Sequence, residues 1–99
     1  MAAQDAERGI VAIATLLAAD RRKLLASPTS GPASYRLFEM LPMMPRFTID
    51  QVRQKLGTTF PTANAAVKVL EALGIVTELT GQKKNRTYSY QAYISALSD

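Results

Sequence analysis

The chain has 99 residues, of which 47% are hydrophobic, enough for one small domain with its own core. It contains no cysteine and no histidine, which excludes disulfides and thiolate metal sites and removes the commonest general base. The eight acids are scattered, with only Asp5 and Glu7 close together, so we expect no enzyme active site, no metal site and no cofactor.

The excess of positive over negative charge lies in one part of the chain. The net charge at pH 7 is +4, and residues 46–90 hold seven cations against three anions, while the remainder is balanced. A localised positive field suits an anionic partner, although a basic protein without such a partner also fits a small excess. The uncharged run 9–19 is shorter than the roughly 20 residues of a membrane span, and acids precede it. We therefore expect a cytoplasmic protein without a membrane segment.

A long helix is predicted over residues 5–26, which are rich in alanine and leucine and end before Pro28. Its apolar stripe is predicted to contain Ile10, Ile13, Ala14, Leu17, Leu24 and Leu25. Residues 27–32 are rich in proline, serine and glycine, which is typical of a hinge. Residues 1–30 are thus interpreted as a connecting helix and hinge, and residues 31–99 as a domain. The long helix either packs on that domain or pairs with a second copy.

A second helix is predicted over residues 33–41, with Leu37, Phe38 and Leu41 on its buried face. Two prolines end it, and we expect Met43 and Met44 between them to fill the core.

Residues 47–74 have the pattern of a helix-turn-helix. Thr48 and Gln51 form a capping box for a short helix that ends at Gly57. After a three-residue turn, Thr59 or Phe60 caps a second helix with proline in its first turn. The inward face of that helix is predicted to contain Ala63, Ala66, Val67, Leu70 and Leu73, and Gly74 ends it.

A β-hairpin is predicted next, with strands over residues 75–79 and 86–90 and a basic turn between them. A short helix over residues 91–97 closes the chain. Tyr88, Tyr90 and Tyr93 fit the core better than they fit stacking on unpaired bases. The fold class is therefore mainly α (α+β), a winged helix-turn-helix with a C-terminal hairpin wing after a long connecting helix.

The outward side chains of this unit are the candidate DNA-binding residues. The predicted helix that begins at Thr59 or Phe60 offers free N–H groups at its positive end, and the asparagine on this helix is suited to reading adenine. We expect the major groove to be faced by Thr59, Thr62, Asn64, Ala65 and Lys68. The hairpin tip should hold phosphates through Lys83, Lys84 and Arg86, with Arg53 and Lys55 as secondary phosphate contacts. A helical hairpin used only for packing, and a polar turn kept only for solubility, are the alternatives.

Several runs resemble one known family. FPTAN at residues 60–64, LEALGIV at 70–76, TGQKKNR at 80–86 and YSY at 88–90 resemble the C-terminal winged helix of Fic-family proteins, a likeness covering about residues 33–97. DRRKLL at 20–25 resembles the segment that joins the Fic core to that domain. The resemblance implies that Thr59, Pro61, Thr62 and Asn64 begin a recognition helix and that residues 81–86 form its wing.

Fic proteins transfer a nucleotide monophosphate, usually AMP, to hydroxyl side chains, using a loop that begins with histidine and ends in Gly-Asn-Gly-Arg. This chain has neither feature, so the resemblance implies a non-catalytic part or relative. The leading hypothesis is a duplex DNA-binding module that regulates or targets a Fic-type protein, with a homodimer through the first helix. The alternative is a protein-interaction or dimerisation module that docks a partner or the Fic catalytic domain. It is kept because the predicted helix that begins at Thr59 or Phe60 has Lys68 as its only cation, with Glu71 opposing it, which is a poor surface for a DNA reader.

Overall fold

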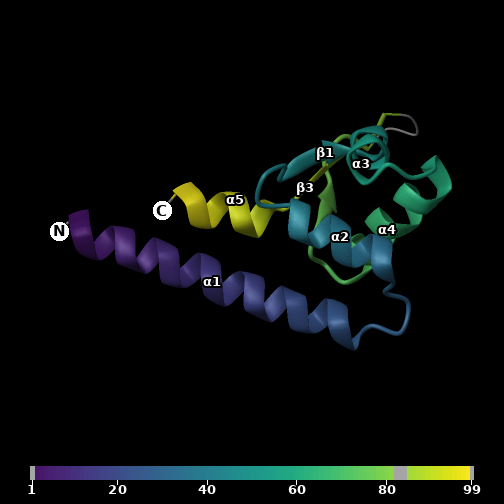
Figure 1. Ribbon diagram of the computed structural model, residues 1–99. Coiled ribbons are helices and arrows are strands. Elements are labelled where there is room, and N and C mark those ends of the chain that lie inside the picture. The colour runs from purple at the N-terminus through teal and green to yellow at the C-terminus, as the bar shows by residue number, and fades with distance from the viewer. Residues whose placement is uncertain (1, 82–84, 99) are drawn as a thin grey trace.

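The computed structural model describes residues 2–81 and 85–98, with side chains described from residue 9 onward. This part of the chain is mainly helical with a small antiparallel sheet, which agrees with the predicted α+β class (Figure 1). In chain order the elements are α1 (Ala2–Ala26), α2 (Pro32–Met40), β1 (Arg46–Thr48), α3 (Ile49–Leu56), α4 (Phe60–Ala72), β2 (Thr77–Glu78), β3 (Thr87–Ser89) and α5 (Gln91–Ser98). No described helix has both the length and the apolar character needed to cross a membrane.

Local hydrogen bonds fix both ends of α3. The N–H of Gln51 donates to Thr48 Oγ1 at 3.2 Å, and the N–H of Thr48 donates to Gln51 Oε1 at 2.8 Å, so the predicted capping box is confirmed. Gly57 follows the helix with φ 63°, a left-handed conformation that glycine adopts without steric cost. The chain then reverses within three residues and enters α4.

The start of α4 is capped by Thr59, whose Oγ1 accepts the N–H of Thr62 at 3.3 Å. Pro61 occupies the first turn, where a missing N–H removes no helical hydrogen bond. At the other end, Gly74 has φ 76°, and the N–H of Ile75 donates to the carbonyl of Leu70 at 2.9 Å. The two helices and the turn between them therefore have the bounds that their capping residues predict.

The sheet has three strands in the order β1-β3-β2, with β3 in the centre and both neighbours antiparallel to it. The prediction of two strands was incomplete, because β1 places Phe47 opposite Tyr88. A three-residue strand is too short to show the alternating pattern that identifies strands in a sequence. The predicted strand 75–79 is also shorter, since Ile75 and Val76 are buried ahead of β2 without lying in it.

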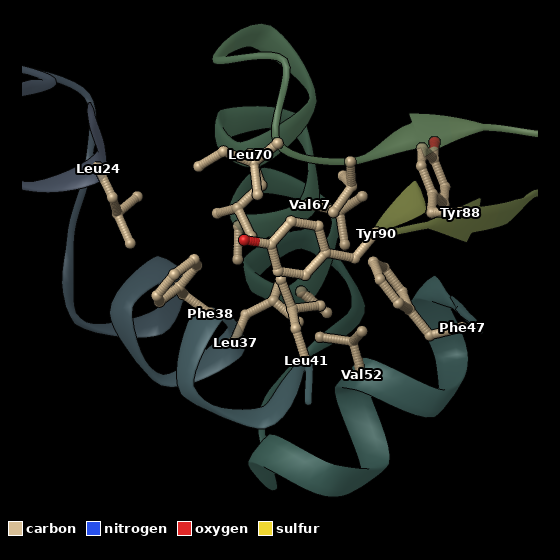
Figure 2. Packing of buried hydrophobic residues seen from close by; sticks show 14 of the residues in the cluster. Leu24, Leu37, Phe38, Leu41, Phe47, Val52, Val67, Leu70, Tyr88 and Tyr90 are labelled. Carbon is tan, nitrogen blue, oxygen red and sulfur yellow. The ribbon is translucent and has the colours of Figure 1, made fainter. Parts of the chain in front are cut away.

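The core lies between α2, α4 and the sheet (Figure 2). Leu37, Phe38 and Leu41 contribute from α2 and the residue after it, and Val67 and Leu70 contribute from α4. The rings of Phe47 and Tyr88 stack with their centroids 5.9 Å apart, and those of Tyr90 and Tyr93 at 5.6 Å. All three tyrosines of the C-terminal region are buried, as the core interpretation predicts. Met43 is 93% exposed, so the prediction that it fills the core was wrong.

Helix α1 runs along one side of the molecule beside α5, and its C-terminal part also contacts α2 (Figure 1). Leu24 enters the core, and Ile13, Leu16 and Leu17 pack against it. Ile10 and Leu25 of the predicted apolar stripe remain 69% and 62% exposed. The reason is that α2 and α5 cover only part of the apolar surface of α1.

Candidate nucleic-acid interface

A groove of about 490 Å³ lies between α4 and the start of β3. Two cations and two amides line it together with apolar side chains. Its lining residues are Ile49, Phe60, Asn64, Lys68, Asn85, Arg86 and Tyr88. The structure therefore brings together Asn64, Lys68 and Arg86, three of the candidate DNA-binding residues from distant parts of the sequence.

The ammonium of Lys68 is held in this groove by two hydrogen bonds. Its Nζ donates to the hydroxyl oxygen of Tyr88 at 3.3 Å and to Glu71 Oε1 at 3.2 Å, and it lies 5.7 Å from the centroid of the Tyr88 ring. The hydrogen bond to Tyr88, followed by that to Glu71, raises the pKa of the Lys68 ammonium above its usual value despite partial desolvation. The ammonium is thus held in place and stays charged, with Glu71 balancing part of its field.

The hydroxyls at the start of α4 are already engaged with each other. Thr59 Oγ1 donates to Thr62 Oγ1 at 3.0 Å while accepting the backbone N–H of Thr62. The hydroxyl proton of Thr59 is therefore used within the helix, and the proton of the exposed Thr62 hydroxyl is the one left to donate outward. The sequence interpretation did not distinguish these two threonines.

Thr62 and Ala65 lie toward a second, shallower pocket of about 350 Å³. Its other walls come from Val69 of α4 and from the start of α2, including Gly31 and Ser34. The outer surface of α4 thus has two sides. Asn64 and Lys68 lie toward the hairpin, whereas Thr62 and Ala65 lie toward α2.

The two secondary candidates on α3 lie outside the groove lining. The Nε of Arg53 donates to Asp50 Oδ1 at 2.8 Å on the exposed surface. Lys55 lines a separate hollow of about 450 Å³ between α2 and α3, with Tyr35 and Glu39. Neither side chain joins Lys68 and Arg86 in the same hollow.

The hairpin turn is ordered at its beginning by the carboxylate of Glu78. Its Oε2 accepts the N–H of Gly81 at 2.6 Å, the N–H of Thr80, and the hydroxyl of Thr80 at 3.0 Å. The bond from Gly81 is the largest cause of the lowered pKa of Glu78, and the positive charge of Arg86 contributes as well. Lys83 and Lys84 of the predicted tip lie outside the described residues.

Four residues that line the groove were not among the candidate DNA-binding residues, namely Ile49, Phe60, Asn85 and Tyr88. Phe60 is 52% exposed at the first position of α4, where it had been considered only as a cap. An exposed aromatic directly after a helix cap, outside the inward apolar stripe, is the signal that would have identified it.

The groove thus combines an exposed ring, two amides and two cations at the junction of α4 with the hairpin. Among the described residues, no group of three or more acidic side chains is placed to hold a metal ion. No protein-family model and no curated protein matches this sequence.

Proposed function

We propose that the chain binds duplex DNA as a winged helix-turn-helix, with α4 in the major groove and the β2–β3 hairpin as its wing. The observation that carries the proposal is the groove shared by α4 and β3, which presents Asn64, Lys68 and Arg86 together. Asparagine amides pair with adenine edges, while lysine and arginine neutralise phosphates. The sequence adds Lys83 and Lys84 to the same hairpin.

The remaining candidates have supporting roles in this proposal. The exposed Thr62 hydroxyl binds a backbone phosphate at the N-terminus of α4, where the positive end of the helix dipole favours an anion. Ala65 is exposed and lets the helix approach the base edges closely. Arg53 and Lys55 contact further phosphates, since Lys55 is exposed on α3 and the side chain of Arg53 is 37% exposed.

Tight binding is expected to require two copies on a two-fold site, since one small module covers a small footprint. The exposed face of α1 is the proposed pairing surface, with Val11, Ala14, Ala18 and Leu25 at alternating spacings of three, four and seven. The sequence places acids at residues 5 and 7 and cations at residues 21–23. An antiparallel second copy therefore brings ends of opposite charge together. Val11→Glu should then lower the mass seen in sedimentation equilibrium.

The resemblance to Fic proteins supports a regulatory or targeting role next to a nucleotidyltransferase. The chain has no histidine and no Gly-Asn-Gly-Arg run, so we propose that it does not transfer AMP itself. Transfer of labelled AMP to any protein by this chain would contradict that part of the proposal.

Fluorescence anisotropy of a labelled mixed-sequence duplex, titrated at several salt concentrations, tests DNA binding. The double variant Lys84→Ala/Arg86→Ala should reduce the slope of log affinity against log salt by about 2, because each phosphate contact contributes roughly 0.9. The control Arg8→Ala/Arg22→Ala removes the same charge from α1 and, where sedimentation equilibrium gives it the wild-type mass, should leave the slope unchanged. Absence of binding at low salt, or equal losses in both variants, would count against the proposal.

A protein-interaction module is the second candidate. It is favoured by the engagement of Lys68 with Glu71 and by the exposed apolar side chains Phe60 and Leu79. In that case the same surface docks a partner or the Fic catalytic domain. The anisotropy experiment separates the two candidates, since this one predicts no salt-dependent binding of any duplex.

A further inference from the structure

We infer that the groove reads an A·T base pair, with Phe60 against the methyl group of thymine and Asn64 bonded to adenine. The inference rests on the proposed DNA function and names the bases that the same site takes. Four observations carry it: the exposure of Phe60, its spacing from Asn64, the chemistry of the two side chains, and the engagement of Lys68.

Phe60 is an apolar side chain placed where polar groups gather. It is 52% exposed at the start of α4 and does not belong to the buried core cluster. Among the exposed large apolar residues of the described part, Phe60 alone lines the groove that contains Lys68 and Arg86. Contact with another apolar group would remove its ring from water, which is favourable in proportion to the area covered.

Phe60 and Asn64 are placed to contact one or two adjacent base pairs. They are four residues apart on α4, so they lie one above the other on the same face of the helix. One helical turn rises about 5.4 Å, and successive base pairs are about 3.4 Å apart. Both side chains line the same groove, so a base edge entering it meets the ring and the amide together.

The chemistry of these two side chains matches A·T rather than G·C. The thymine methyl is the apolar group that the major groove presents, and a phenylalanine ring covers it well. An asparagine amide donates to adenine N7 and accepts from its N6 amino group. Guanine is normally read by lysine or arginine. Two of the three donors of the Lys68 ammonium already bond Tyr88 and Glu71, and the proposed role of Arg86 is to hold a phosphate, so neither cation of the groove favours guanine.

Base analogues test the methyl contact with the wild-type protein alone. Anisotropy titrations would compare an A·T-containing duplex with the same duplex carrying uracil for thymine, which keeps the pairing and removes the methyl. We expect affinity to fall about three- to tenfold, the loss typical of one uncovered methyl group. A G·C duplex should gain affinity when its cytosines carry a 5-methyl group, because that group occupies the thymine methyl position.

Two variants assign the contact. Phe60→Ala should bind the thymine and uracil duplexes equally, whereas the matched control Leu79→Ala, which removes a side chain 50% exposed, should keep the difference. Asn64→Ala should weaken the preference for A·T over G·C and keep the effect of the methyl group. Thermal melting would verify that each variant is folded.

The outcomes separate this inference from the DNA proposal. Equal, salt-dependent affinity of the wild type for thymine and uracil duplexes would overturn the methyl contact and leave DNA binding intact. Absence of binding to every duplex at low salt would overturn both.

Discussion

The hydroxyl of Tyr90 donates a hydrogen bond to Asp20 Oδ2 across 2.5 Å, although the two residues are 70 positions apart in the chain. Tyr90 is fully buried and Asp20 is only 5% exposed. Lys23, the other partner of Asp20, lies farther away, with its Nζ 3.5 Å from Oδ1. A buried polar contact therefore joins α1 to the residue that follows β3.

Tyr90→Phe should lower the free energy of unfolding by about 1–3 kcal/mol, because it leaves the buried carboxylate of Asp20 without its closest donor. Urea denaturation monitored by circular dichroism measures the loss. Asp20→Asn and the double variant complete a thermodynamic cycle, and the two losses should not be additive. Additive losses would show that the two side chains do not stabilise each other.

Alkaline pH should destabilise the protein through the same tyrosine. Burial, and then the hydrogen bond to Asp20, raise the pKa of Tyr90 above its ordinary value. The unfolded chain loses this proton near pH 10 while the folded chain keeps it, so the contribution is present below about pH 10 and lost as pH rises further. Urea denaturation between about pH 8 and pH 11 measures that loss.

Tyr90→Phe is the control for this pH dependence. The raised pKa of Lys68 also makes the folded state less stable as pH rises, but only weakly, because its side chain is 43% exposed. This contribution of Lys68 remains in Tyr90→Phe. Wild type should therefore lose more stability than Tyr90→Phe over the same interval. Parallel pH profiles would contradict the assignment to Tyr90.

The docking of α1 should depend on burial more than on its surface ion pair. Arg21 Nη2 lies 2.9 Å from Glu39 Oε1, but these side chains are 45% and 61% exposed, and such pairs contribute at most about 1 kcal/mol. Leu24 is 1% exposed in the core, and Leu24→Ala should cost about 2–5 kcal/mol. Urea denaturation of Leu24→Ala and Glu39→Gln compares the two, and a larger loss for Glu39→Gln would reverse this ranking.

Gly57→Ala should destabilise the turn between α3 and α4 by about 1 kcal/mol, because φ at this position is 63°. A Cβ at Gly57 meets no atom within 4 Å, so the cost is conformational rather than steric. Gly9→Ala is the matched control, since Gly9 lies within α1 with equally open surroundings and alanine favours a helix. Thermal melting should therefore show a loss for Gly57→Ala alone, and equal melting temperatures would contradict the backbone argument.

Helices α3 and α4 and the turn between them were predictable because their boundaries are set by neighbours in the chain. Thr48 and Gln51 satisfy each other's N–H groups across three residues, and Thr59 caps α4 through Thr62. Gly57 ends α3 because its own backbone adopts a left-handed conformation easily. These interactions form within one helical turn and need no partner element, so the sequence by itself determined the two helices and the turn between them.

Long-range contacts decided what the sequence left open. In the sequence, Asp20 is followed by three cations, a pattern typical of a solvent-exposed helical turn. Its hydrogen bond with Tyr90 forms only because α1 docks on the rest of the chain. Strand β1 exists because Phe47 meets Tyr88, and Phe60 joins Asn64 and Arg86 in one groove only after α4 and β3 are placed together. Pairing and burial depend on which surfaces the packed elements cover, and residue spacing shows only that a face is apolar, not what covers it.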